Sequence, residues 1–278
     1  MLIELSKLVL FVKNMSGYVL STNEFARKRL EIQHNLYLDS SLELLGKANI
    51  KEGMKCLEIG CGSGDMTCEI AALIGEEGKL FAIDVSEEQV KASKTKARDF
   101  HNIFFKTMGL EDIDEIGERF DFIYCRMVLH HLNNPSDAIR KMVACLNDNG
   151  ILVCEEPPLL EGTFSYPFSP ALEELEKLVH ACFEANHKDW RIGYRLAEEM
   201  QNCGLSIQNE SLFQPMLSTM EQKMLYIMGM NDIRPQLMQT NLVSETEFEL
   251  LKQKLMELVT SVNSITWLRM HQCVGVKT

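Results

Sequence analysis

The stretch of sequence most suited to chemistry is centred on three glycines at alternate positions. Gly60, Gly62 and Gly64 follow the short apolar run Cys56–Ile59 and precede an apolar, helix-like segment that ends near Ile74. A buried strand, a glycine turn and a helix together form a ligand cradle at the carboxyl end of a parallel sheet. The glycines allow backbone angles that are closed to other residues, and they let a ligand lie against bare main chain.

Acidic residues flank this turn. Glu58 stands two positions before the first glycine, and Asp65 follows the last. A dinucleotide-binding turn reads G-x-G-x-x-G and faces a pyrophosphate, which both carboxylates would repel. They suit instead a ligand that carries an ammonium and a sulfonium. Twenty residues beyond Gly64 a second apolar run ends in Asp84, and a carboxylate there can accept hydrogen bonds from both hydroxyls of a ribose.

The segment Leu57–Gly64 closely resembles the first motif of class I S-adenosylmethionine-dependent methyltransferases, and Asp84 matches the ribose-binding acid of their second motif. Three later segments look like the fourth strand of that family, the loop behind it and the turn before the fifth strand: Asp121–Arg126, Leu129–Leu132 and Leu146–Ile151. The resemblance covers roughly residues 45 to 157 and is specific as a set. It implies S-adenosylmethionine as the cofactor and S-adenosylhomocysteine as the product.

The same resemblance implies roles for single residues. Glu58 would orient the amine of the methionine part, Asp84 would bind the ribose, and Val85 and Leu110 would enclose the adenine. Arg126, or its backbone, would lie near the methionine part. The resemblance thus predicts these cofactor-binding residues: Tyr18, Gln33, Glu58, Gly60, Cys61, Gly62, Gly64, Asp84, Val85, Leu110, Glu111 and Arg126.

Three of these assignments, Glu111, Tyr18 and Gln33, have competing explanations. Gly109 stands where the family commonly has an acid that binds the adenine, so Glu111 or Asp112 would take the exocyclic amine instead, unless both are solvated acids at the start of a helix. Tyr18 and Gln33, with Arg29, resemble an N-terminal pattern that covers the cofactor, but ordinary packing also explains them.

His130 and His131 follow the expected fourth strand, on the side of the cofactor that bears the methyl group. Methyl transfer from a sulfonium needs alignment, exclusion of water and, for some acceptors, removal of a proton. Histidine accepts protons near neutral pH, so these two residues are candidate bases. Alternatively, they make structural hydrogen bonds that shape the loop. Adjacent histidines do not easily face one ion and no acid or cysteine has ligand spacing to them, so we expect no metal site.

The periodicity predicts strands near residues 55–59, 79–84, 102–106, 121–125 and 150–155, with helices at 65–74, 87–98 and 135–146. Earlier helices are expected from Glu24 to about Leu36 and from Asp39 to Lys47. Later elements are a helix from about Pro170, a strand at Leu205–Phe213 and a last strand at Ile265–Val276. The sequence therefore predicts an α/β fold with a doubly wound, Rossmann-like, seven-stranded sheet that is mostly parallel, an antiparallel last strand and a helical lid.

We expect a single domain. Residues 1–157 would hold the N-terminal helices and the cofactor-binding core, and residues 158–278 the lid and the last two strands. Met216, Met220, Met224 and Met228 recur every fourth residue, which predicts one stripe of a helix, either core or a deformable wall for the acceptor. With the aromatic residues of the lid, this favours a small apolar acceptor held by residues 160–194 and 216–262.

Composition narrows the class of protein further. The chain has 278 residues, 46% of them apolar, and a net charge of −12 without any lysine or arginine block, which disfavours a nucleic-acid partner. Nine cysteines without a Cys-x-x-Cys pair indicate free thiols and a cytoplasmic protein. The apolar stretch of residues 1–13 is too short to span a membrane. It is an extra packed element, a segment before a true start at Met15, or a membrane anchor.

Two other functions remain open at this stage. A nicotinamide-dependent oxidoreductase uses a similar sheet and a similar ribose acid, and a non-catalytic scaffold could keep the cofactor site without turnover. The sequence leaves the methyl-accepting atom and the choice between monomer and homodimer undetermined.

Overall fold

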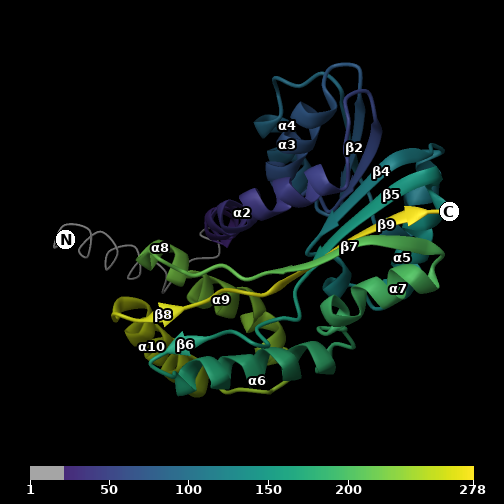
Figure 1. Cartoon of the computed structure of the whole chain (residues 1–278). Coiled ribbons are helices and arrows are strands. Elements are labelled where there is room, and N and C mark those ends of the chain that lie inside the picture. The colour runs from purple at the N-terminus through teal and green to yellow at the C-terminus, as the bar shows by residue number, and fades with distance from the viewer. Residues whose placement is uncertain (1–21) are drawn as a thin grey trace.

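The fold is described by a computed structural model that covers residues 22–278, with side chains from Lys28 onward. Tyr18, Met15 and the N-terminal apolar stretch lie outside the described residues. A seven-stranded sheet forms the centre of the molecule, and a group of helices lies beside one end of it (Figure 1). Within residues 22–278, no helix combines the length and the apolarity that crossing a membrane requires.

The sheet has the order β3-β2-β1-β4-β5-β9-β7. The first five strands pair in parallel, and β9 runs antiparallel to both β5 and β7. The strand order therefore reverses between β1 and β4, where ligands bind in such sheets. This arrangement confirms the predicted fold class. The strands are β1 (Lys55–Ile59), β2 (Lys79–Asp84), β3 (Ile103–Thr107), β4 (Phe120–Arg126), β5 (Leu146–Glu156), β7 (Leu205–Phe213) and β9 (Met270–Lys277).

Helices cover both faces of the sheet because successive side chains of each buried strand point to opposite faces. On β1, Cys56 packs toward α2 (Thr22–Lys47) and α3 (Asp65–Ile74), and Leu57 packs toward α5 (Pro135–Ala144) on the other face. The remaining elements around the sheet are α4 (Glu87–Lys96), α7 (Leu196–Asn202) and the 3-10 helices η2 (Leu110–Ile116), η3 (Leu129–His131) and η4 (Ile192–Arg195).

A second apolar core lies outside the sheet. It joins α6 (Pro170–Ala185), α8 (Met220–Lys223), α9 (Leu225–Gln239) and α10 (Glu245–Thr260), and we call this group, with the short pair β6 (Ser165–Tyr166) and β8 (Ser264–Ile265), the helical lobe. Ile32 and Tyr37 of α2 pack into the same core. The helical lobe is the segment expected as a lid, and α2 runs between it and the sheet (Figure 1).

The expected break in the first helix is wrong, because α2 is continuous through Asp39 and Ser40. Serine favours a helix start when its hydroxyl caps backbone N–H groups. Here the hydroxyls bond the sheet instead. Ser40 Oγ accepts from Gln272 Nε2 at 2.9 Å, and Ser41 Oγ donates to the carboxylate of Glu155 at 3.1 Å.

The last strand and the methionine stripe also differ from expectation. Residues 266–269 interrupt the predicted strand because Trp267 and Leu268 pack into the core of the helical lobe. The stripe does not lie on one helix, since Met216 pairs with Thr266 in a bridge before α8. Met224 and Met228 are buried in the helical-lobe core, so the core interpretation holds for them.

Candidate functional site

A cavity of about 510 Å³ lies at the carboxyl ends of β1, β2 and β4, with α2 along one side; we call it the first cavity. This volume lies within the usual range for small-molecule sites. The cavity gathers eleven of the fourteen residues predicted to bind the cofactor or act in catalysis: Gln33, Glu58, Gly60, Cys61, Gly62, Asp84, Val85, Leu110, Glu111, Arg126 and His131. Gly64 and His130 are absent from its lining.

The three glycines of the turn have different physical reasons to be glycine. A Cβ at Gly60 would run into Cγ2 of Val128, on the loop after β4. A Cβ at Gly64 would meet Ser93 of α4, so Gly64 lets α3 and α4 approach each other. Gly62 has a φ of +50° and open space where its Cβ would be, on the cavity side. Gly62 is therefore the position where a ligand can lie against bare main chain.

Glu58 carries a buried carboxylate at the end of β1. It is 3% exposed, and its Oε2 accepts a hydrogen bond from Thr67 Oγ1 at 2.6 Å. Burial raises the pKa of Glu58 to about 8, although the Thr67 hydrogen bond and the charge of Arg126 oppose this rise. A cationic group placed in the first cavity would favour the ionised carboxylate.

Asp84 ends β2 and fastens the glycine turn. Its Oδ2 accepts from the backbone N–H of Gly62 at 3.0 Å, and its Oδ1 accepts from that of Ser86 at 2.9 Å. Each carboxylate oxygen keeps a lone pair for a further donor. Asp84 thus holds the turn and faces the cavity with acceptor capacity to spare.

Gly109 stands where the family commonly has an acid, and the nearby Glu111 places its carboxylate in the same space. A Cβ at this position would collide with the carboxylate of Glu111, which therefore occupies the space that a side chain at position 109 would take. Glu111 lines the first cavity and Asp112 does not. The acid that the sequence lacks at position 109 is thus replaced in space by one two residues later.

Arg126 belongs to a buried polar network that the sequence analysis missed. Its Nη1 donates to Ser41 Oγ at 3.1 Å, and Ser41 donates to Glu155, which is fully buried. Tyr124 OH also donates to Glu155. Burial and the Arg126 charge lower the pKa of His34, which favours a neutral imidazole beside the guanidinium. The network fixes Arg126 at the wall of the first cavity.

A second cavity of about 220 Å³ adjoins the first and extends into the helical lobe. Five residues line both: Arg29, Leu30, Gln33, Met127 and His131. The other residues that line the second cavity are mostly apolar, namely Pro157, Leu159, Leu160, Leu175, Val179, Phe183, Tyr226, Gly229, Met230, Ile233, Trp267 and Leu268, together with His130 and Asp232.

The polar groups of the second cavity cluster where it meets the first. Arg29 Nε pairs with Asp232 at 2.6 Å, and its Nη1 donates to Gln33 Oε1 at 2.8 Å. Burial raises the pKa of Asp232. Tyr226, farther into the lobe, donates its hydroxyl to the carbonyl of Thr266 and presents its ring instead. The second cavity therefore has one polar end, and the rest of its wall is apolar.

Glu156 organises the loop that carries both histidines. Its side chain is fully buried, and its Oε1 accepts from the backbone N–H groups of Val128 and Leu129 at 2.7 and 2.8 Å. Its Oε2 lies 2.7 Å from His130 Nδ1. His131 lies at the junction of the two cavities, with its ring centroid 4.0 Å from that of His130. The His130 charge, burial, and the Arg29 and Lys188 charges lower the pKa of His131 to about 2.

The sequence carried a weak signal for some of the missed residues. Glu155 and Glu156 end an apolar run before Pro157, and acids at the carboxyl end of a predicted strand point toward the ligand edge. Asp232 and Gly229 gave no such signal, because both lie in α9, far along the chain from the glycine turn.

A model of the methyltransferase-domain family matches residues 29–210. A demethylmenaquinone methyltransferase of Staphylococcus saprophyticus is 24% identical over 135 residues, which are 49% of this chain and 55% of that protein. A ubiquinone/menaquinone biosynthesis C-methyltransferase of Idiomarina loihiensis is 26% identical over 51% of this chain and 54% of its own length. The chain thus spans about half the length of these curated relatives.

One solved structure, the YcgJ protein from Bacillus subtilis, is similar in fold. It shares 16% identity with a TM-score of 0.56, over 85% of this chain and 97% of that one. At this identity the likeness concerns the fold alone.

Proposed function

This chain belongs to the methyltransferase-domain family, and we propose that it transfers a methyl group from S-adenosylmethionine to a small apolar acceptor held in the second cavity. The observation that carries the proposal is the junction of the two cavities at His131. A polar cavity with acids for a cationic cofactor meets an apolar cavity with one polar end. This is the arrangement that an in-line displacement between two bound molecules requires. Membership in the family argues against the nicotinamide-dependent alternative.

The residues of the first cavity fit S-adenosylmethionine. S-adenosylmethionine supplies a methyl group on a cationic sulfur. Gly62 leaves main chain open, Glu58 offers a buried carboxylate for the ammonium, and Asp84 offers its free lone pairs to a ribose. Val85 and Leu110 would enclose the adenine, and Glu111 would accept from its exocyclic amine. Gln33, Cys61 and Arg126 complete the proposed cofactor-binding set, and Gly60 and Gly64 shape the turn.

The second cavity supports an apolar acceptor with one polar end. The acceptor would direct its polar end to the junction, where Arg29, Gln33 and His131 lie, and its apolar part toward residues such as Leu175 and Trp267. The lowered pKa of His131 makes its neutral imidazole a weak base, so it would take only a proton that methyl transfer has made strongly acidic. His130 is engaged with Glu156 and would act on His131 rather than on the acceptor.

The relatives suggest where to look for the acceptor. Their names refer to demethylmenaquinone and to ubiquinone and menaquinone biosynthesis, so reduced short-chain quinones are the first acceptors to test. The net charge of −12 disfavours a nucleic acid as the acceptor. All nine cysteines are free, which suits a protein of the reducing cytoplasm.

The test uses S-adenosylmethionine with a labelled methyl group, first with reduced short-chain quinones and then with organic and aqueous extracts of cells. We expect label in a product that partitions into organic solvent. Label that enters only water-soluble products would contradict the apolar acceptor. Calorimetry with S-adenosylhomocysteine, run in parallel, should show binding, and its absence would contradict the cofactor assignment.

A further inference from the structure

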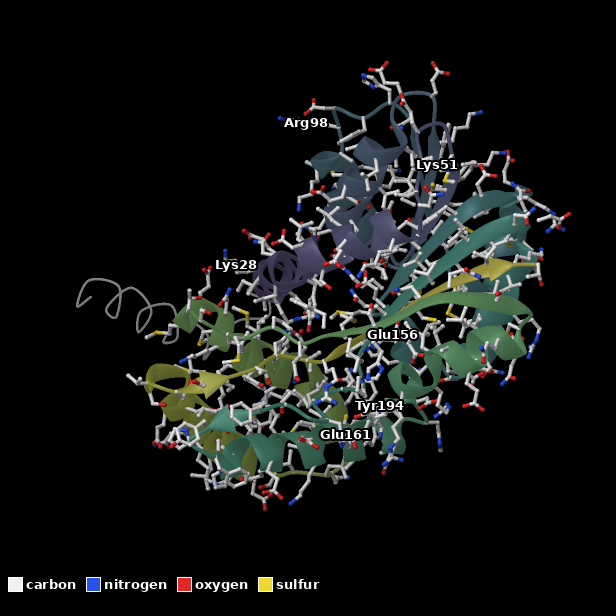
Figure 2. The ribbon with its side chains drawn as sticks, viewed as in Figure 1. Lys28, Lys51, Arg98, Glu156, Glu161 and Tyr194 are labelled. Atoms are coloured by element: carbon white, nitrogen blue, oxygen red, sulfur yellow. The ribbon has the colours of Figure 1, made fainter. Side chains whose placement is uncertain are left out.

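Glu156 is a carboxylate with an unusual set of partners. It is fully buried at the end of β5, and all its hydrogen bonds go to the loop after the neighbouring strand β4. Figure 2 shows Glu156 in the interior, near the place where the sheet meets the helical lobe. A buried charge is costly unless it is paired and hydrogen-bonded, so this carboxylate holds its partners firmly.

The loop that Glu156 holds forms the partition between the two cavities. Met127 lines both cavities. Its backbone φ is +57°, a value that is rare for residues other than glycine. Val128 packs against Gly60 of the glycine turn, and its N–H is bound by Glu156. The carboxylate therefore fixes the backbone from which His131 extends.

Glu156 is also linked to His131 through the side chain of His130. Its Oε2 faces Nδ1 of His130, and the His130 ring lies beside that of His131. A positive charge on the His130 ring would lie next to His131 and oppose its protonation. The other charged groups that face this position are Arg29 of α2, its partner Asp232 of α9, and Lys188 after α6.

We propose that Glu156 is a positioning residue: through His130 and the loop after β4, it holds a neutral His131 imidazole at the junction of the two cavities. The inference rests on the proposed function, because it gives His131 the task of accepting a proton from the acceptor. It can nevertheless be tested on the protein alone, without any acceptor.

The test follows the protonation of His131 by nuclear magnetic resonance in protein labelled with ¹⁵N-histidine. The seven histidine signals are recorded from pH 8 to pH 5, and that of His131 is identified with His131→Gln. In the native protein we expect His131 to stay neutral over this range. In Glu156→Gln, which keeps an acceptor for the loop N–H groups but lacks the charge, the midpoint should rise into this range, above pH 5.

His130→Gln tests the proposal independently. It can also be used if Glu156→Gln does not fold. It should raise the His131 midpoint in the same direction, and the double variant should go no further than the larger single effect. Glu155→Gln is the matched control, since Glu155 is equally buried but bonds Ser41, Tyr124 and Gln272 instead. It should leave the His131 midpoint unchanged.

A native His131 that titrates with the ordinary midpoint near 6.5 would overturn the inference. So would a His131 that stays neutral from pH 8 to pH 5 in Glu156→Gln and His130→Gln as well as in the native protein. Binding of S-adenosylhomocysteine is measured separately on the same samples. If the native protein does not bind S-adenosylhomocysteine, the proposed function is contradicted. The His131 titration can still be interpreted in that case.

Discussion

The first and second cavities share five lining residues, yet their walls come from different kinds of sequence. The wall of the first is built mainly from strand ends and the turns that follow them, with α2 on one side. The second takes its wall from α2, α6, α9 and the segment around Trp267, which are far apart in the chain. The comparison teaches that the first cavity, proposed for the cofactor, depends on local turn geometry, whereas the second cavity, proposed for the acceptor, depends on packing of the helical lobe.

The largest expected effect tests how far the second cavity depends on that packing. Met224 is 1% exposed in the helical-lobe core, so Met224→Ala should lower the free energy of unfolding by about 2–5 kcal/mol. Met216 is 48% exposed, and Met216→Ala should change the free energy of unfolding by less than about 0.5 kcal/mol. Denaturant unfolding measures both, and equal effects would mean that these methionines do not divide into core and surface.

Filling the second cavity should separate turnover from cofactor binding. Gly229 lies inside α9, and a Cβ there would meet only Trp267, at 4.0 Å. Gly229→Phe should cut turnover by about 100-fold, because an acceptor displaced by an ångström reacts far more slowly. Affinity for S-adenosylhomocysteine should stay within twofold, a limit of roughly 0.4 kcal/mol.

Gly229→Ala is the matched control for that variant. It should keep turnover and raise the free energy of unfolding by about 0.5–1 kcal/mol, since alanine loses less entropy than glycine in a helix. If Gly229→Phe methylates its acceptor at the native rate, the acceptor does not bind in the second cavity.

Removal of a cofactor contact should act on the first cavity only. Asp84→Ala should weaken binding of S-adenosylhomocysteine by about 1.5–3 kcal/mol, or roughly 10–150-fold, since it removes a charged hydrogen-bond partner. Asp112→Ala, an exposed acid outside the lining of the first cavity, is the control. Calorimetry gives both values, and equal affinities in a folded Asp84→Ala would remove this residue from the site.

A further effect is a pH dependence of cofactor affinity that belongs to the first cavity. The pKa of Glu58 is raised to about 8, so its carboxylate becomes available to the cofactor amine as the pH rises. Affinity for S-adenosylmethionine should therefore increase between pH 6 and 8, by at most about tenfold per pH unit. Glu58→Gln should flatten this dependence. A native affinity that is constant from pH 6 to 8 would show that Glu58 does not titrate there.

The raised pKa of Glu58 also affects the stability of the fold, which should decrease as the pH rises. Because the folded pKa of Glu58 lies above its usual 4.5, its contribution to stability is present below about pH 4.5 and is lost as the pH rises through about 8. Glu58→Gln should remove this part of the decline, which thermal unfolding at several pH values would detect.

The sequence was sufficient for the sheet and for most of the first cavity. The glycine turn and Asp84 are local motifs, and strand patterns depend on residues close in the chain, so β1, β2 and β7 appear at the predicted bounds. The roles of Gly60 and Gly64 in packing could not be predicted, because Val128 and Ser93 are distant in the chain.

The second cavity was predictable only as an apolar pocket within two long segments. Its polar end depends on the Arg29–Asp232 pair, which joins α2 to α9 across about two hundred residues of chain. The methionine period suggested one helix, but the break between α8 and α9 and the interrupted last strand follow from packing around Trp267. Such contacts have no signature in local periodicity.

The division between the two cavities can be tested directly through the methionine methyl groups. Among the sixteen methionines, Met66 and Met108 line the first cavity only, Met230 lines the second only, and Met127 lines both. The measurement is a nuclear magnetic resonance titration of ¹³C-methyl-methionine protein with S-adenosylhomocysteine. We predict shifts of the Met66, Met108 and Met127 signals, with Met230 unmoved. Shifts concentrated at Met230, with Met66 and Met108 unmoved, would contradict the assignment of the cofactor to the first cavity.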